Sequence, residues 1–283
     1  MHSNHLNPSR YWSDWSTRDF DKLRQEGQLQ NWVAVLPLAA TEQHGPHLPV
    51  RVDSALVDGV VAASLQHLQL DAKVLFLPTQ TVGFSPEHSA FAGTLTLKAE
   101  TLIRLWTDIA ESVAASGFKK LLFLNSHGGQ VGFMDIVARD LRARLGMLVY
   151  SANWFNLPLV DAQGHNVNDL FSAHEHRFGV HAGEIETSMM LALDPEHVQM
   201  QHAQNFASTS EDRATNYAIL GDGKTAKLAW QIQDYNPSGA VGNAIAASSE
   251  KGQRVIDAAG LSLARLLTEL QQLPLSTLAP SFK

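Results

Sequence analysis

The sequence Trp32-Val-Ala-Val-Leu-Pro-Leu-Ala-Ala40, followed by Thr41-Glu-Gln-His-Gly-Pro-His-Leu-Pro49, decides the fold class. The first part is an almost continuous apolar run, which predicts a buried strand. The second part is polar and contains glycine and proline, which predicts a loop at the carboxyl end of that strand. Proteins of the α/β class bind ligands outside the carboxyl ends of parallel strands, so we expect a functional site at this loop.

The rest of the chain alternates between apolar runs and amphipathic segments. Three further apolar runs predict strands at 74–77, 119–124 and 147–152. Three amphipathic segments predict helices at 53–68, 98–116 and 131–145. This alternation predicts an α/β fold, a three-layer α/β/α sandwich around a mostly parallel, doubly wound sheet.

The remaining segments are expected to be helices or long loops. Apolar spacing predicts a short helix within 11–27, a helix at 180–193 and a final helix at 244–270. Residues 156–178 and 199–240 show little periodicity, which predicts loops, with short elements in the second of them. Because no repeat, low-complexity segment or linker divides the sequence, we expect a single domain over residues 1–283.

The composition is typical of a globular protein without thiol chemistry. The 283 residues are 45% hydrophobic, and the formal net charge of −7 argues against nucleic acid or an anionic membrane as a partner. The absence of cysteine leaves only nitrogen and oxygen ligands for a metal, which suits zinc, manganese or ferrous iron. Met1 to Arg24 has no apolar core of a signal peptide, and no run is long enough to span a membrane. We therefore expect a cytoplasmic protein.

Three metal-capable side chains, Glu42, His44 and Asp53, follow the first predicted strand. In an extended segment residues i and i+2 point the same way, so Glu42 and His44 can face one point. Glycine and proline then turn the chain so that Asp53 can return to that point, where its two oxygens could bridge two cations. An ordinary polar loop is the alternative interpretation, and Asp53 could instead cap the following helix.

Two further segments supply candidate residues. His127 follows the third predicted strand, and the two glycines after it leave space beside its imidazole. His181 and Glu184 are three residues apart at the start of a predicted helix and can share a face, whereas Glu186 points elsewhere. The dipole at a helix N-terminus favours carboxylates and would by itself explain one of the two glutamates.

Together these side chains predict a dinuclear metal site. The predicted ligands are two histidines and three carboxylates, namely Glu42, His44, Asp53, His127 and Glu184. With Asp53 as a bridge, two divalent ions would each have about three protein ligands and open positions for water and substrate. A hydroxide held between two such ions is a competent nucleophile at neutral pH, and the second ion can polarise a carbonyl.

The chain resembles the creatininase (creatinine amidohydrolase) family over nearly its whole length. The resemblance rests on Glu42 to Pro49 with Asp53, on Asn125-Ser-His-Gly-Gly129, on His181-Ala-Gly-Glu-Ile-Glu-Thr-Ser188 and on Gly239 to Gly252. It implies a three-layer fold, a dinuclear zinc, manganese or iron centre, hydrolysis of C–N bonds in cyclic or linear amides, and a hexamer. It also implies metal ligation by Glu42, His44, Asp53 and His127, and a substrate-side role for His181.

The chain departs from true creatininases at Gly129 and Glu184. Creatininases have a metal-binding glutamate at the position of Gly129 and an apolar residue at the position of Glu184. We therefore expect Glu184 to supply the missing carboxylate, with Glu186 as support for the ligands or as an alternative ligand. The departure puts creatinine in doubt as the substrate, and the combination of His-Gly-Gly with His-Ala-Gly-Glu resembles the deformylase-like branch of the family more closely.

The leading hypothesis is a metal-dependent amidohydrolase that cleaves a C–N bond of a small cyclic amide or formamide by a metal-bridged hydroxide. Its predicted catalytic residues are His181, beside the oxyanion, and Glu184 or Glu186, which would move a proton to the leaving nitrogen. The alternatives are a non-catalytic metal-binding or assembly protein on the same fold, a creatininase proper, and a metal-free serine hydrolase that uses Ser126. We expect a small-molecule amide substrate and no nucleic-acid or membrane partner.

Overall fold

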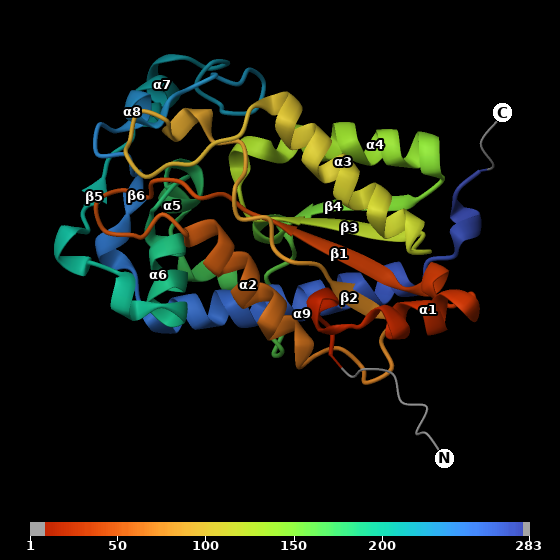
Figure 1. Ribbon diagram of the computed structural model, residues 1–283. Coiled ribbons are helices and arrows are strands. Elements are labelled where there is room, and N and C mark those ends of the chain that lie inside the picture. The colour runs from red at the N-terminus through yellow and green to blue at the C-terminus, as the bar shows by residue number, and fades with distance from the viewer. Residues whose placement is uncertain (1–8, 280–283) are drawn as a thin grey trace.

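A four-stranded parallel sheet forms the centre of the structure, a computed structural model in which residues 9–279 are described (Figure 1). Residues 1–8, the first part of the polar N-terminal stretch, and residues 280–283 lie outside the described range. The strands are β1 (Val33–Leu38), β2 (Val74–Phe76), β3 (Lys120–Asn125) and β4 (Leu148–Asn153). Their spatial order is β2-β1-β3-β4, so the chain runs from β1 to one side and then crosses to the other. The sheet is therefore doubly wound, as predicted.

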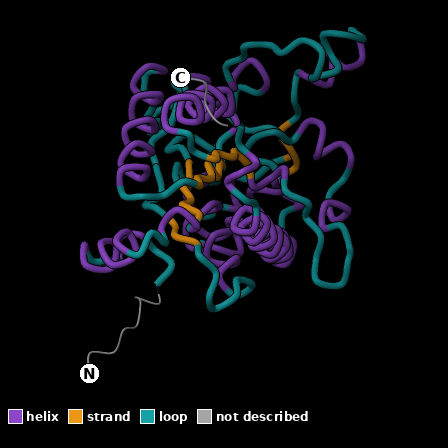
Figure 2. The backbone as a smooth tube through the Cα atoms, turned by 90° about the vertical axis from the view of Figure 1, so that its right-hand side faces the viewer, coloured by secondary structure: helices purple, strands orange, loops and turns teal. Residues whose placement is uncertain are grey.

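Helices cover both faces of the sheet, which confirms the predicted three-layer fold. One face is covered by α2 (Val52–Leu65), α6 (Glu184–Leu193) and α9 (Ser249–Gln272). The other is covered by α1 (Thr17–Gln25), α3 (Ala99–Ala115) and α4 (Val131–Leu145). Figure 2 shows the strands gathered between the two sets of helices.

The continuous apolar runs reflect a sheet that is buried on both sides. In β1, Val33 and Val35 pack into the core beneath α2 and α9, whereas Ala34, Leu36 and Leu38 pack into the core beneath α3 and α4. Successive side chains of a strand point to opposite faces, so a covered strand needs apolar residues at every position. All six residues of β1 are buried.

A buried lysine joins the amino end of β3 to the C-terminus of α9. The Nζ atom of Lys120 donates hydrogen bonds to the carbonyl oxygens of Leu270, Gln271 and Leu273, at 2.9, 2.7 and 2.6 Å. The last carbonyls of a helix have no partner within the helix, and a cation there also meets the negative end of the helix dipole. Lys120 is 3% exposed, and these three bonds satisfy its charge.

The structure differs from the sequence-based expectations mainly outside the sheet. A short helix, α5 (Ala173–Phe178), lies within the segment 156–178, where only loop was expected. The helix α6 begins at Glu184, so His181 precedes it and forms a bridge with Val241. The final helix begins at Ser249, because Ser248 accepts a hydrogen bond from the backbone N–H of Lys251 and caps it.

The carboxyl ends of the strands are covered by the long segment that follows α6. It contains the short helices α7 (Ser210–Asn216) and α8 (Ile232–Tyr235), and a small antiparallel pair of β5 (Asn205–Phe206) with β6 (Gly242–Asn243). In Figure 1 these elements lie at the left, where the arrows of the sheet end. Among the residues described, no helix is long and apolar enough to cross a membrane.

Candidate metal centre

The candidate site lies at the carboxyl edge of β1 and β3, the neighbouring strands at which the winding of the sheet reverses. Glu42 and His44 follow β1, Asp53 lies in the first turn of α2, and His127 follows β3. All four side chains are at most 3% exposed. The crevice at such a reversal is the usual ligand site of a doubly wound sheet, and here it is lined by metal-capable side chains.

Four groups of metal-capable side chains are found among the described residues, and two of them share the carboxylate of Asp53. The other two are Glu42 with His44 and His181, and Glu42 with Glu87 and His88. In the first of the two groups that share Asp53, His127 Nδ1 lies 3.3 Å from Glu42 Oε2 and 3.5 Å from Asp53 Oδ2. In the second, His44 Nε2 lies 3.7 Å from Asp53 Oδ1 and 3.9 Å from Glu186 Oε2. The two oxygens of Asp53 therefore face different groups, which is the arrangement that a bridging carboxylate requires.

Hydrogen bonds to carbonyl oxygens fix the tautomers of both histidines. His44 Nδ1 lies 3.0 Å from the carbonyl oxygen of Glu42, and His127 Nε2 lies 2.9 Å from that of Phe84. A carbonyl oxygen only accepts, so each of these nitrogens carries a proton. Whenever the ring is neutral, its opposite nitrogen is the one that carries the lone pair, and this nitrogen faces the shared carboxylate, as in metal-binding histidines.

Three buried ligand atoms of the site have no hydrogen-bond partner in the described structure: Glu42 Oε2, His44 Nε2 and Asp53 Oδ2. A buried polar atom without a partner destabilises a fold by about 1–3 kcal/mol, and a charged one by more. Because these atoms belong to facing side chains, one or two cations would satisfy them together. The imidazole and carboxylate donors suit zinc and manganese.

The pKa values of the metal-free cluster show that several carboxylates lie close to one another and to His127. Burial, together with the charge of Glu42, raises the pKa of Asp53 well above its usual range. Burial alone would lower the pKa of His127, but the carboxylates of Glu42, Asp53 and Glu87 raise it to about 10. Without a cation, a proton therefore sits between His127 Nδ1 and the carboxylates, and a bound cation would displace it.

Comparison with known proteins identifies the family. The sequence profile of creatininase, creatinine amidohydrolase, matches residues 15–267. This chain belongs to the creatininase family. It is therefore a hydrolase of a family whose members depend on metal ions and act on C–N bonds.

The named relatives of this creatininase-family chain have different substrates. A mycofactocin precursor peptide peptidase of Mycobacterium ulcerans is 31% identical over 230 residues, which cover 79% of this chain and 80% of the relative. A 3-dehydro-scyllo-inosose hydrolase of Thermotoga maritima is 26% identical over 271 residues, 87% of this chain and 80% of the relative. A solved structure described as creatininase Mn covers 92% of this chain and 98% of its own, with a TM-score of 0.72 at 22% identity. A Zn-Zn form of a creatininase variant superposes with a TM-score of 0.71 at 22% identity, over 93% of this chain and 98% of its own.

The two glutamates at the start of α6 lie in different surroundings. Glu186 belongs to the second metal-capable group, and its Oε2 accepts a hydrogen bond of 2.5 Å from the backbone N–H of Ala182. Glu184 belongs to none of the groups found among the described residues, and its Oε1 accepts a hydrogen bond from Lys251 Nζ. The structure therefore brings together Glu42, His44, Asp53, His127 and Glu186, and it does not bring Glu184 to them.

The carboxylate beside Gly129 comes from Glu87, a residue that sequence reasoning missed. A Cβ atom added at Gly129 would overlap Glu87 Oε1 and lie 2.6 Å from His127 Nε2, so the missing side chain makes room for this carboxylate. Glu87 Oε1 lies 3.4 Å from His127 Nε2, and burial raises the pKa of Glu87. Glu87 and His88 lie in the loop that follows β2. The rule that ligands bind at the carboxyl ends of parallel strands, which pointed to the loops after β1 and β3, applies to this loop as well.

Gln43, also missed, orients two further imidazoles. Its Oε1 accepts from the backbone N–H of Gly45 at 2.9 Å, and its Nε2 lies 2.8 Å from the carbonyl oxygen of Gly239 and 2.7 Å from His88 Nδ1. His88 Nδ1 must therefore accept, which leaves an N–H on Nε2, 3.3 Å from Glu42 Oε1. His88 is thus a hydrogen-bond donor to the cluster.

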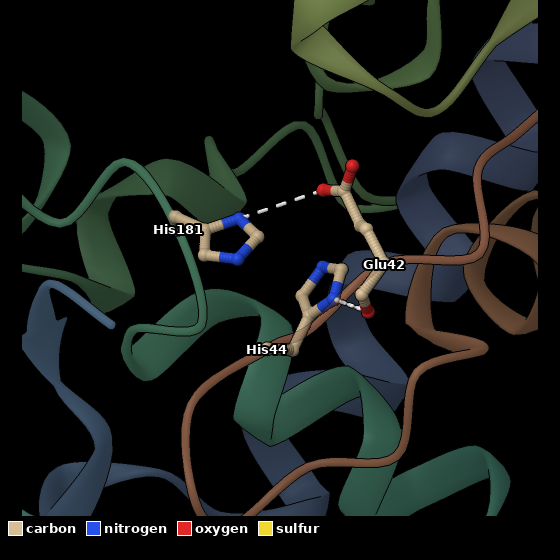
Figure 3. Close-up of side chains that lie close together, drawn as sticks. All are labelled: Glu42, His44 and His181. Carbon is tan, nitrogen blue, oxygen red and sulfur yellow. Dashed lines mark hydrogen bonds and ion pairs between the residues drawn. The ribbon is translucent and has the colours of Figure 1, made fainter. Parts of the chain in front are cut away.

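His181 faces the cluster with its other nitrogen. Its Nε2 lies 2.8 Å from the carbonyl oxygen of Gln43 and so carries a proton, and its Nδ1 lies 3.8 Å from Glu42 Oε1. Figure 3 shows Glu42, His44 and His181 pointing toward one another. Burial and the neighbouring His44 lower the pKa of His181 to about 4, so the ring is neutral at pH 7 with a lone pair toward the site.

Ser126 does not have the surroundings of a serine nucleophile. It is buried, and its Oγ accepts a hydrogen bond of 2.9 Å from the indole of Trp154. Activation of a serine needs a base within hydrogen-bond reach of the hydroxyl, and among the described residues no histidine is bonded to Ser126 Oγ. The geometry therefore favours the metal cluster over this alternative.

Proposed function

We propose that the chain is a dinuclear amidohydrolase whose two divalent ions are held by Glu42, Asp53 and His127 and by His44, Asp53 and Glu186. The observation that carries the proposal is the set of facing, buried atoms Glu42 Oε2, His44 Nε2 and Asp53 Oδ2, none of which has a hydrogen bond of normal geometry to a described residue. Bound ions would lower the pKa of a coordinated water and polarise an amide carbonyl. Glu186 takes the ligand role in this proposal because Glu184 is bonded to Lys251.

The chain's own residues then supply proton transfer. His181 is neutral at pH 7, and its Nδ1 lone pair faces the cluster, so it can accept a proton released as water adds to the carbonyl. Burial raises the pKa of Glu87, which favours its protonated form, and we assign to this carboxyl the transfer of a proton to the leaving nitrogen. His88 donates to Glu42 and fixes the orientation of that carboxylate.

The substrate we propose is a small cyclic amide or a formamide. The similarity to a mycofactocin precursor peptide peptidase adds a peptide-derived amide to the same reaction class, because hydrolysis of a C–N bond is common to all three. Creatinine is the second candidate, supported by the family match. A cytoplasmic hexamer remains part of the proposal, and the mass of the assembly can be measured by light scattering.

The proposal is tested by the metal content of the purified protein and by hydrolysis before and after chelation. We expect about two ions per chain, and cleavage of at least one substrate among creatinine, formamides, small lactams and short peptides that stops on chelation and returns with zinc or manganese. Less than about half an ion per chain after reconstitution, with no hydrolysis, would favour the non-catalytic binding protein. Activity that survives chelation and is lost in Ser126→Ala would favour the serine hydrolase.

A further inference from the structure

A cavity of about 300 Å³ lies beside the candidate metal centre and is lined by three cationic side chains, Arg177, Arg213 and Lys227. Arg177 belongs to α5 and Arg213 to α7, while Lys227 lies on the loop between α7 and α8. The aromatic rings of Trp230 and Tyr235 form part of its wall.

The cavity adjoins the metal centre through Trp230 and Val180. The ring of Trp230 meets that of His88 edge-on, with their centres 6.2 Å apart, and His88 Nε2 lies 3.3 Å from Glu42 Oε1. Val180 lines the cavity, and the next residue is His181, which faces the cluster. Trp230 and the Val180–His181 segment are thus shared between the wall of the cavity and the surroundings of the cluster.

None of the three cations forms an ion pair with a carboxylate among residues 9–279. Arg213 lies over the ring of Tyr235, with its Cζ atom 4.8 Å from the ring centre, and its Nη1 donates to Thr209 Oγ1 at 3.1 Å. Its Nη2 is buried and has no hydrogen-bond partner in this part of the chain. One donor of the guanidinium group is thus left without a partner among the described residues, and this atom is itself buried.

One carboxylate, Asp222, also lines the cavity, but its own turn uses it. Its Oδ1 accepts from the backbone N–H groups of Lys224 and Thr225 at 2.7 and 2.8 Å, and its Oδ2 accepts from the hydroxyl of Thr225 at 2.5 Å. The cavity therefore keeps a net positive charge next to apolar and aromatic surface.

We propose that this cavity binds a free carboxylate of the substrate. Resting on the proposed hydrolase function, this inference names the substrate class: amides with a carboxylate beside an apolar or aromatic group, such as N-acylated amino acids and peptide C-termini. Two guanidinium groups can bind a carboxylate through paired N–H donors, and the aromatic wall accommodates the neighbouring side chain. The cavity has room for about one amino-acid residue.

The test is a binding assay on the metal-loaded protein with matched pairs of probes. The panel contains N-formyl and N-acetyl derivatives of phenylalanine, tyrosine, leucine and alanine, and Ala-Ala-Xaa tripeptides, each as the free acid and as the C-terminal amide. We expect at least one acid to bind 10-fold or more tightly than its amide. That preference should fall to less than threefold in Arg213→Gln and in Arg177→Gln and should persist in Arg104→Gln, which removes an exposed arginine on α3.

Each outcome decides the proposal. It is overturned if no acid is preferred over its amide, or if the preference survives in the Arg177→Gln/Arg213→Gln double variant. Arg177→Gln, at an exposed position, serves as the second variant if Arg213→Gln does not fold. Metal content and hydrolysis are measured on the same samples. Acid binding without metal or cleavage would refute the proposed function alone, and two ions with cleavage but no acid preference would refute the carboxylate site alone.

Discussion

Two buried carboxylates at the same edge of the sheet, Glu175 and Asp53, differ in how their oxygens are satisfied. Glu175 is 1% exposed, and its oxygens accept hydrogen bonds from the backbone N–H groups of Glu184 and Asn243 at 2.6 and 2.8 Å. Asp53 is 2% exposed, and its Oδ2 has no partner within the described residues. Burial is therefore the same, and only the second carboxylate is left for a cation.

The surroundings of Glu175 are built to hold that one side chain. A Cβ atom added at Gly179, Gly183 or Gly242 would overlap its carboxylate or come close to it, so three glycines leave the space that it fills. Buried carboxylates that backbone N–H groups satisfy belong to the fold, and those left unsatisfied indicate a ligand. A substitution of Asp53 should therefore cost metal binding but not stability, and a substitution of Glu175 should cost stability but not metal binding.

The largest effect is expected from Asp53→Asn, which removes the shared carboxylate. We expect less than about one ion per chain and a fall in kcat/KM of at least about 100-fold. Loss of a residue that supports a ligand typically lowers affinity or activity by about 10- to 100-fold, and loss of the ligand itself should cost more. The metal-free protein should be as stable as the parent or more stable, since burial and Glu42 already oppose the charge of Asp53. Elemental analysis and thermal unfolding with a chelator measure both.

Glu42→Gln is the companion variant for this first prediction, because Glu42 belongs to three of the four metal-capable groups but not to the group of His44, Asp53 and Glu186. It should also lose metal and activity together. A Glu42→Gln protein with full metal content and full turnover would contradict the assignment of the site, and a marked loss of stability in metal-free Asp53→Asn would show that Asp53 belongs to the fold as Glu175 does.

The next effect separates Glu186 from Glu184, two residues apart on one helix. Glu186→Gln should weaken metal affinity by about 10- to 100-fold, because Glu186 belongs to the second metal-capable group. Glu184→Gln should leave the affinity within about threefold and lower stability by about 1 kcal/mol, because it weakens the bond to Lys251. Metal titration against a competing chelator measures both, and the reverse result would restore the sequence-based ligand set.

The third prediction concerns Glu175→Gln, which is expected to destabilise the fold by about 2–3 kcal/mol. The substituted amide turns one oxygen into an N–H donor, which then faces a backbone N–H. Metal affinity should stay within about threefold of the parent, because Glu175 belongs to none of the metal-capable groups. Urea unfolding gives the free energy, and a loss of metal comparable to that of Asp53→Asn would abolish the contrast between the two carboxylates.

The sequence predicted the sheet and most of the candidate ligands because both depend on local patterns. Apolar runs located β1 to β4, and the edge rule, with the turn made by glycine and proline, placed Glu42, His44, Asp53 and His127 together. The sequence could not show which of Glu184 and Glu186 faces the site, because that depends on the residue at which α6 begins. Because His181 lies outside the helix, its three-residue spacing from Glu184 does not place the two side chains on one helix face.

Long-range packing explains what sequence reasoning missed. Glu87 enters the site because Gly129, far along the chain, has no side chain, and Gln43 orients His88 through a bond to Gly239. The cationic cavity combines residues of α5, α7 and the loop after α7, none of which has a periodic pattern. No spacing rule connects such segments, and only the folded chain shows that they meet.

The smallest effect is expected from Gly129→Ala, compared with Gly128→Ala. The new methyl group would collide with Glu87 Oε1 and lie close to His127 Nε2, whereas at Gly128 nothing lies within 4 Å. Because the His127 ring is held by the carbonyl of Phe84, Glu87 must move away. We expect a loss of about 1 kcal/mol and a metal affinity a few-fold weaker for Gly129→Ala, against less than about 0.5 kcal/mol for Gly128→Ala. Equal effects in the two variants would mean that the space beside Gly129 does not position Glu87, and the role of Glu87 in proton transfer would lose its geometric basis.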